Sequence, residues 1–321
     1  MTKPKILITG ANGQIGQVLS VQLAKKYGKE QILRTDLAQN DDGLLPYKSL
    51  DVLDKSRMAQ IVEQHQITQI YHLAALLSAS GEKNIHKTWD INFNGLVHVL
   101  DVAKEFSVDR VFFPSSIAVY GSGFNKSFTA QNDFRNPSTM YGITKVAGES
   151  WGNYYWMKYG LDVRSIRYPG IIGYQSLPGG GTTDYAVDIF HEALKSEKYT
   201  CFLESATRLP MIYMDDAIRA TIELMEASTE NISVRTSYNL QGLSFTPAEL
   251  AEEIRKHRPN FTIEYHPDFR QEIAAQWPEI MDDQLARNDW SWKPAFDLSE
   301  MTKDMILNLS KKYNKDYVEP N

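Results

Sequence analysis

The feature that most constrains the fold is an alternation of short apolar runs and longer segments with helical periodicity over the first 170 residues. The runs are rich in β-branched residues and mostly lack polar alternation, which is typical of parallel strands covered on both faces. We expect strands at residues 5–9, 31–35, 69–73, 110–115 and 162–167, and helices near residues 15–27, 56–64, 89–106 and 139–159. The pattern predicts an α/β fold, a doubly wound parallel sheet with right-handed crossovers.

A second, smaller lobe is predicted where this alternation stops. Pro169, Gly170 and the run 178–181 interrupt regular structure, whereas residues 211–220 and 237–240 look like elements that return to the sheet domain. Thr246-Pro247-Ala248-Glu249 has the composition of a helix capping box. We expect a sheet domain of residues 1–170 plus about 211–242, and a discontinuous α/β lobe of about 171–210 plus 243–321.

Composition excludes several classes of protein. The chain has 34 Lys and Arg against 40 Asp and Glu and no marked basic run, which argues against nucleic acid and anionic membranes as partners. The single cysteine, Cys201, fits a reducing compartment. No apolar stretch is long enough for a signal peptide or a membrane span, so we expect a cytoplasmic protein. The histidines lack paired spacings, so no metal site is expected.

A glycine loop follows the first predicted strand and opens the first helix, with glycines at positions 10, 13 and 16. Glycines in this context allow a tight turn and a close backbone approach to a pyrophosphate at the helix N-terminus. The spacing is G-x-x-G-x-x-G rather than the commoner G-x-G-x-x-G. The predicted phosphate-binding set is Gly10, Asn12, Gly13, Gln14, Ile15 and Gly16.

A carboxylate, Asp36, follows the second predicted strand, where it can accept hydrogen bonds from the ribose hydroxyls of NAD and would repel a 2′-phosphate. Arg34 lies two residues earlier and faces the same way, which leaves NADP as an alternative. We expect NAD as the cofactor. Asp51 and Val52 are weaker candidates beside the adenine, and Asp51 is equally well explained as a solvated loop residue.

Tyr141 and Lys145 stand four residues apart, so a helix would place them on one face. A free phenol has a pKa of about 10, and a nearby ammonium favours its ionised form. The pair alone is common and is more often a surface feature. Ser115 and Ser116, at the end of a predicted parallel strand, point to the edge of the sheet where ligands bind, which favours a chemical site.

Together these motifs resemble the extended branch of the short-chain dehydrogenase/reductase superfamily, which has a Rossmann-like fold. The motifs are Gly10/Gly13/Gly16, Asp36, residues 72–75 and 92–95, Ser115, Ser116, Tyr141, Lys145 and residues 167–170, in order between residues 5 and about 220. The resemblance implies that Tyr141 is the general acid/base, that Lys145 binds the nicotinamide ribose and lowers the pKa of Tyr141, and that Ser116 or Ser115 binds the reacting oxygen. It further implies a cofactor channel formed by Leu73, Ala74, Ala75, Tyr168 and Pro169, with Asn92 on the central helix in a largely architectural role.

Two classes of substrate are compatible with this branch, a nucleotide sugar and a small zwitterion. Nucleotide-sugar epimerases and dehydratases bind a diphosphate and need cations, yet residues 168–194 contain no Lys or Arg. Asp184 could meet an ammonium, and Thr182 and Thr183 a carboxylate, which suits a small zwitterion, although each threonine is equally well a helix cap. Arg208 favours a diphosphate. A non-catalytic NAD-sensing protein is a third reading, disfavoured by the intact Ser/Tyr/Lys set.

Residues 76–78, 113–120, 167–174, 178–185 and 208–211 resemble, more narrowly, a family of this branch that oxidises L-threonine with NAD. This resemblance implies oxidation at C3 to 2-amino-3-ketobutyrate without a metal. The residues it implies around the amino acid are Ser78, Ser115, Tyr141, Thr182, Thr183, Asp184 and Trp277, although Trp277 is equally well a core residue.

Aromatic residues crowd the end of the helix that carries Tyr141, namely Trp151, Tyr154, Tyr155 and Trp156. One core-facing stripe cannot bury all of them. We expect a homodimer through this helix and the helix near residues 89–106, the habit of the superfamily, with burial under the second lobe as the alternative.

Overall fold

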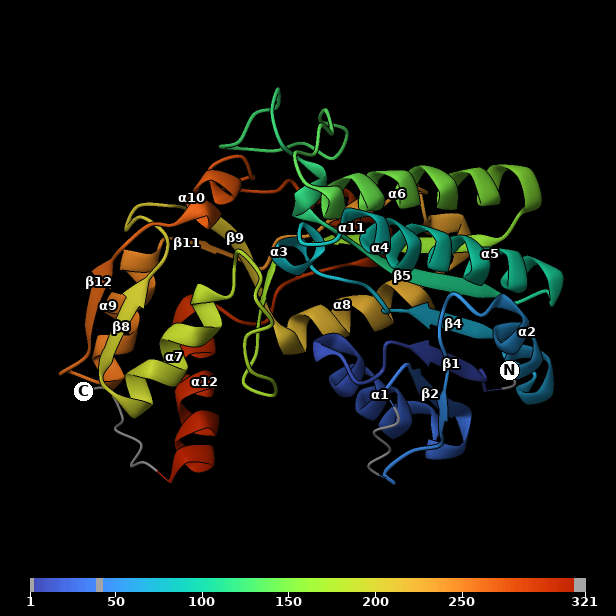
Figure 1. The fold of residues 1–321 in the computed structure, drawn as a ribbon, viewed down its shortest axis with the longest axis horizontal. Coiled ribbons are helices and arrows are strands. Elements are labelled where there is room, and N and C mark those ends of the chain that lie inside the picture. Colours follow the sequence, from blue (N-terminus) through green and yellow to red (C-terminus); the bar gives the residue numbers. More distant parts are fainter. Residues whose placement is uncertain (1–2, 39–42, 315–321) are drawn as a thin grey trace.

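The computed structural model describes residues 3–38 and 43–314. Figure 1 shows a large sheet covered by helices on both faces, with a smaller lobe beside it that contains α7, α9 and α12. Residues 1–2, 39–42 and 315–321, which the predicted domain ranges include, lie outside the described residues.

The large sheet has seven parallel strands in the order β10-β6-β5-β4-β1-β2-β3. The strands are β1 (Ile6–Thr9), β2 (Ile32–Asp36), β3 (Tyr47–Ser49), β4 (Gln69–His72), β5 (Arg110–Ser116), β6 (Asp162–Tyr168) and β10 (Tyr238–Asn239). The order reverses between β1 and β4, which creates the switch point where ligands of such sheets bind. The predicted doubly wound α/β fold is confirmed.

Five of these strands lie within one residue of their predicted bounds. The sequence did not reveal β3, a three-residue edge strand that pairs only with β2 and has no buried residue. So short and half-exposed a strand leaves no hydrophobic pattern to detect.

Helices cover both faces because successive strand residues point to opposite sides. Leu7 packs with α2 and α5, whereas Ile6 and Ile8 pack with α1 and α8. The helices of this domain are α1 (Gln14–Tyr27), α2 (Lys55–His65), α3 (Ser78–Gly81), α4 (Ile85–Trp89), α5 (Gly95–Glu105), α6 (Met140–Tyr159), α8 (Met214–Glu226) and α11 (Gln284–Trp290). A π-helical segment, η2 (Asp90–Asn94), interrupts the helix predicted at residues 89–106.

Two smaller sheets lie outside the main one. One joins β7 (Gly170–Ile172), β9 (Leu209–Tyr213) and β11 (Leu243–Phe245), and the other joins β8 (Lys198–Cys201) and β12 (Thr262–Tyr265). The accompanying helices are α7 (Tyr185–Lys195), α9 (Pro247–His257), α10 (Phe269–Ala274) and α12 (Leu298–Tyr313). The predicted capping box begins α9. The strand near Met211 pairs with β7 and β11 and not with the main sheet, while Ile212 and Met214 pack in one core with Ile8 of β1.

A buried carboxylate joins β5, α6 and β6. Glu149 of α6 has no exposed surface and accepts hydrogen bonds from Nε and Nη2 of Arg167, both at 2.9 Å. It also accepts from Arg135 at 2.7 Å and from the Ser115 hydroxyl at 2.6 Å. Burial raises the pKa of Glu149, but the charge and hydrogen bonds of Arg167 outweigh it, so the pKa lies below its usual value. We call Glu149, Arg167 and Ser115 the clamp.

Removing one member of the clamp should destabilise the protein strongly. Glu149→Leu leaves the Arg167 guanidinium buried without its counterion, which should lower the free energy of unfolding by about 3–5 kcal/mol. The double variant Glu149→Leu/Arg167→Met removes both charges and should lose clearly less than the sum of the single variants. Urea denaturation of Glu149→Leu, Arg167→Met and the double variant measures the three losses in the free energy of unfolding, and additive losses would contradict the clamp.

Candidate active site

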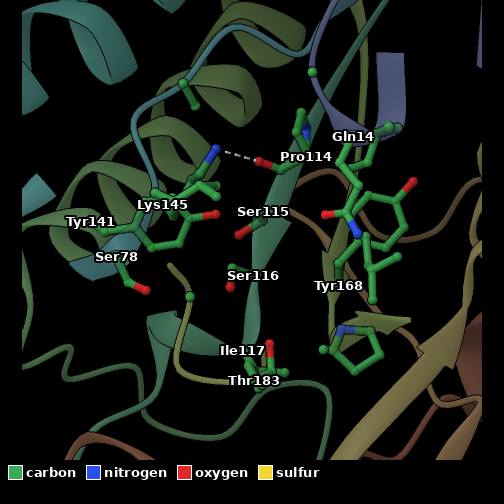
Figure 2. Close-up of a pocket in the computed structure, with 18 of the residues that line it drawn as sticks. Gln14, Ser78, Pro114, Ser115, Ser116, Ile117, Tyr141, Lys145, Tyr168 and Thr183 are labelled. Carbon is green, nitrogen blue, oxygen red and sulfur yellow. Dashed lines mark hydrogen bonds between the residues drawn. The ribbon is translucent and has the colours of Figure 1, made fainter. Parts of the chain in front are cut away.

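A pocket opens at the C-terminal ends of β1, β4, β5 and β6, beside the switch point. Figure 2 shows Tyr141 and Lys145 on one side, Tyr168 and Gln14 on the other, and Ser115 and Ser116 on the strand between them. The predicted residues that line it are Gly10, Gly13, Gln14, Ile15, Gly16, Leu73, Ala75, Ser78, Ser115, Ser116, Tyr141, Lys145, Tyr168, Pro169, Thr182, Thr183, Asp184 and Trp277. Folding thus brings the predicted cofactor, chemical and substrate residues around one cavity.

Other predicted cofactor residues lie outside the pocket lining. The backbone of Ala74 packs closely against the glycine loop, because its N would lie 2.5 Å from a Cβ at Gly10. Asn92, in η2, holds the loop after β4: its amide accepts the Leu76 N–H at 2.8 Å and donates to the Leu76 carbonyl at 3.0 Å. Its role in the structure is therefore architectural.

The two weaker adenine candidates have ordinary surroundings. Asp51 is exposed and accepts the Leu53 N–H at 2.9 Å, as a loop carboxylate does. Val52 is buried against Gly95 of α5. Their place beside an adenine stays a prediction.

The glycine loop fits a dinucleotide pyrophosphate. Gly10 has a φ of 69°, and a Cβ on Gly16 would lie 2.5 Å from the Gly10 carbonyl oxygen. Helix α1 begins after Gly13 with no side-chain cap and no acidic residue in its first turn. The backbone N–H groups at the helix start therefore remain available to an anion.

The carboxylate of Asp36 is held beside this loop. Its oxygens accept the N–H of Asn12 at 3.0 Å and of Ala38 at 3.3 Å, and the residue stays partly exposed. Arg34 is buried, with its guanidinium carbon 5.8 Å from the centre of the Tyr47 ring. Backbone N–H groups thus orient the Asp36 carboxylate, the hydrogen-bond acceptor expected for the ribose, while Arg34 packs against β3.

Tyr141 and Lys145 lie on one face of α6, as predicted from their spacing. The Lys145 ammonium donates to the Pro114 carbonyl at 2.8 Å (Figure 2) and lies 5.3 Å from the centre of the Tyr141 ring. Burial raises the pKa of Tyr141 to about 12, against hydrogen bonding by Ser116, and burial lowers the pKa of Lys145 to about 8. The expectation that Lys145 lowers the pKa of Tyr141 is not met, because the ammonium is directed to Pro114 and burial dominates.

Ser115 and Ser116 have different hydrogen-bond partners. The Ser115 hydroxyl donates to Glu149 and belongs to the clamp. Ser116 accepts the Ala118 N–H at 3.2 Å and acts by hydrogen bonding on the phenol of Tyr141. Ser116 is therefore the better placed of the two for a reacting oxygen.

The far wall of the pocket combines the turn before α7 with the smaller lobe. The Thr182 hydroxyl is buried and has no hydrogen-bond partner among the described residues. Asp184 accepts the N–H groups of Gly180 and Gly181, both at 2.7 Å, so its carboxylate organises the glycine turn as well as facing the pocket. Trp277 lines the pocket from the segment after α10.

Arg208 does not reach this pocket. Its guanidinium donates to the Ser244 carbonyl at 2.9 Å and to Glu249 at 2.5 Å. Within residues 3–38 and 43–314, Lys145 is the one Lys or Arg in the pocket lining.

Across those same ranges, no helix is both long and apolar enough to span a bilayer. The described residues also contain no group of His, Cys, Asp or Glu side chains that could hold a metal ion.

Sequence reasoning missed Leu77, Ile117 and Ile171 in the pocket lining, because isolated apolar residues carry no chemical signature. It also missed Glu149. That residue follows Lys145 by four positions, so the periodicity of a helix placed it on the reactive face and could have indicated it.

A doubly wound sheet with a glycine loop at its switch point and a phenol–ammonium pair beside a strand-ending serine is the architecture of the short-chain dehydrogenase/reductase superfamily. Comparison with known families narrows this class. The family model described as "NAD dependent epimerase/dehydratase family" matches residues 6–240, and the chain belongs to that family. The predicted resemblance to the extended branch is thereby confirmed.

Individual relatives are similar over nearly the whole chain. A mitochondrial L-threonine 3-dehydrogenase of Sus scrofa is 45% identical over 308 residues, which cover 95% of this chain and 82% of the pig protein. An L-threonine dehydrogenase from Cupriavidus necator in its holo form is 50% identical, with a TM-score of 0.94 over 95% of this chain and 100% of that one. A monomeric L-threonine 3-dehydrogenase from a metagenome is 47% identical, with a TM-score of 0.93 over 96% and 99% of the two chains.

Replacing the buried ammonium should stabilise the protein in a pH-dependent way. The pKa of Lys145 falls from 10.5 to about 8 on folding, so the folded state disfavours its charged form. The resulting penalty is complete below pH 8 and disappears as the pH rises towards 10.5. Lys145→Met should therefore raise the free energy of unfolding at pH 6.5 by at most about 3 kcal/mol, reduced by the lost hydrogen bond.

Urea denaturation of wild type and Lys145→Met at about pH 6.5 and about pH 10 tests this linkage. The exposed residue Lys198 supplies the control variant Lys198→Met, for which we expect little change at either pH. An equal gain at both pH values would show that the ammonium is not desolvated as described.

Proposed function

We propose that the chain is an NAD-dependent dehydrogenase that oxidises L-threonine at C3 to 2-amino-3-ketobutyrate. The observation that carries this proposal is the charge of the described pocket lining, which contains one ammonium, Lys145, one carboxylate, Asp184, and no guanidinium. A diphosphate substrate needs several cationic donors. A zwitterionic amino alcohol carries its own compensating charges, and the names of the pig and Cupriavidus relatives support this choice.

The proposed proton transfer uses Tyr141 and Ser116. Ser116 would hydrogen-bond the C3 hydroxyl oxygen, and Tyr141 would accept the hydroxyl proton. Bound NAD would supply the hydride acceptor and a positive charge. Because burial raises the pKa of Tyr141 to about 12, its action as a base requires positive charge beyond that of Lys145. Lys145, fixed on the Pro114 carbonyl, would hold the nicotinamide ribose.

The cofactor and the amino acid would occupy opposite parts of the pocket. The loop of Gly10, Gly13 and Gly16 would bind the pyrophosphate, and Asp36 would accept hydrogen bonds from the adenosine ribose. The remaining predicted contacts would be to the amino acid. The Thr182 hydroxyl, which has no partner among the described residues, would bind its carboxylate with Thr183 and Ser78, while Asp184 would bind its ammonium and Trp277 would cover its side chain. We propose NAD rather than NADP because Asp36 would repel a 2′-phosphate and Arg34 packs on Tyr47.

A nucleotide-sugar epimerase or dehydratase is the weaker candidate. Arg208 was the one sequence feature in its favour, and both donor groups described for its guanidinium are bonded to Glu249 and Ser244. A non-catalytic NAD sensor would have no use for Tyr141, Lys145 and Ser116 around one cavity.

A substrate panel tests the proposal. The purified protein is incubated with NAD and either L-threonine or a UDP-sugar, and NADH absorbance and sugar products are both measured. We expect NADH with L-threonine and no sugar conversion. Sugar conversion without threonine-dependent NADH would contradict the proposal.

The variant Tyr141→Phe should separate chemistry from binding. Removing the phenol oxygen should lower kcat with L-threonine by about 100- to 10,000-fold, because no other described group in the pocket is placed to accept the proton. NAD affinity, measured by fluorescence titration, should change little. Near-normal turnover would show that Tyr141 is not the base.

We also propose a homodimer formed through α6 and the helical segment of residues 89–106. Trp151, Tyr154 and Met157 are 38%, 44% and 68% exposed on this helix, whereas Tyr155 is buried and Trp156 lies under the Arg235 guanidinium at 3.6 Å. The excess aromatic surface is therefore smaller than the sequence predicted, yet still forms one apolar face. The metagenomic relative is described as monomeric, so the state of this chain needs its own test.

Sedimentation of wild type, Met157→Asp and the control Phe269→Asp tests the dimer. Phe269 is 61% exposed but lies on α10 of the smaller lobe. We expect a dimeric mass for wild type and the control, and a monomeric mass for Met157→Asp, because the new charge would be buried at the interface. A monomeric wild type at micromolar concentration would contradict the proposal.

A further inference from the structure

The loop formed by residues 121–136, here called the strap, lies along the chain between Ser116 and Tyr141, the two residues proposed to act on the hydroxyl group. It leaves the 3-10 turn η3 (Ile117–Val119) that follows Ser116, and the chain returns at Thr139, which caps the helix carrying Tyr141. Its ends meet closely, since a Cβ on Gly121 would lie 1.9 Å from the Asn136 carbonyl oxygen. Figure 1 shows this green loop at the top of the molecule, between α6 and α10.

The tip of the strap pairs with the segment that carries Trp277. The Thr129 N–H donates to the Ile280 carbonyl at 2.9 Å, and the Asp282 N–H donates to the Thr129 carbonyl at 2.9 Å. The Glu279 N–H also donates to the Lys126 carbonyl at 2.8 Å. The wall of the pocket that comes from the smaller lobe is therefore attached to the strap by backbone hydrogen bonds.

Gln131 fixes the strap to the main sheet. Its side-chain oxygen accepts the Asn239 N–H at 2.8 Å, and its side-chain nitrogen donates to the Ser237 carbonyl at 2.7 Å. Since β10 is the edge strand of the sheet, the amide of Gln131 completes the backbone pairing on that edge. The Gln131 carbonyl also accepts from Arg167 at 2.8 Å, which links the strap to the clamp.

From this connected path we infer that Gln131 is a positioning residue: by holding the strap on β10 and Arg167, it sets the place of Trp277 relative to Ser116 and Tyr141. Gln131 is buried and does not line the pocket, so it would act on the amino acid only through Trp277. The inference rests on the proposed function, in which Trp277 covers the amino acid. It predicts an effect on the KM for L-threonine and little effect on NAD binding.

The variant Gln131→Met keeps the length of the side chain and removes both of its hydrogen bonds. We expect the KM for L-threonine to rise about tenfold, equivalent to ~1.4 kcal/mol, with the Kd for NAD nearly unchanged and kcat changed less than KM. All constants are measured well below the Tm of each variant. A lower Tm with a wild-type KM would show that Gln131 is merely structural and would overturn the inference.

The variant Gln131→Glu provides a rescue experiment. An ionised carboxylate would oppose the Ser237 carbonyl, whereas a protonated one can donate to it as the amide does. We therefore expect the ratio of the variant KM to the wild-type KM to fall as the pH is lowered. Arg167, which donates to the Gln131 carbonyl, and its partner Glu149 keep their charges because their pKa values are raised and lowered, respectively. A raised ratio that does not change with pH would contradict the inference.

A matched control lies at the start of β6, whose far end carries Tyr168 of the pocket. Thr229 donates a hydrogen bond to Asp162 at 2.9 Å and does not line the pocket. Thr229→Val should lower the Tm and leave the KM for L-threonine unchanged, and an equal rise in KM would overturn the inference. If wild type itself does not reduce NAD with L-threonine, the proposed function fails. If wild type reduces NAD and Gln131→Met keeps the wild-type KM, the inference alone fails.

Discussion

The carboxylate of Glu149 is the interaction on which the arrangement of the site depends. Helix α6 is attached to the end of β5 at two successive turns, by Lys145 on the Pro114 carbonyl and by Glu149 on the Ser115 hydroxyl. Arg167 adds β6 to this assembly. Because Ser116 and Tyr141 lie on the two elements so joined, these contacts help to set their relative position, together with the hydrogen bond of Ser116 to the phenol of Tyr141.

The main sheet was predictable because helices cover both of its faces, so its strands are apolar runs that a single sequence reveals. Three features were not. The edge strand β3 is too short to show a pattern, the π-helical segment around Asn92 depends on its hydrogen bonds to the loop after β4, and β9 is apolar enough for either sheet. Its pairing with β7 and β11 is decided by tertiary contacts that no local sequence window contains.

The site was predictable where spacing along one element sets the geometry, as for the glycine loop and for Tyr141 with Lys145. It was less predictable where partners come from distant segments. The bonds of Arg208 to Ser244 and Glu249, and the opposing effects of burial and of the Ser116 hydrogen bond on the pKa of Tyr141, arise only in the folded chain. The strap likewise connects residues near 130 with residues near 240 and 280, which no motif links.

A crystal structure of the chain with NAD and L-threonine bound tests the proposed roles of Tyr141 and Ser116 most directly. It should show the C3 hydroxyl within hydrogen-bond distance of the Tyr141 and Ser116 oxygens, with the amino acid between Thr182 and Trp277. An amino acid bound elsewhere, or a Tyr141 oxygen directed away from its C3 hydroxyl, would contradict the claim that Tyr141 and Ser116 perform the proton transfer.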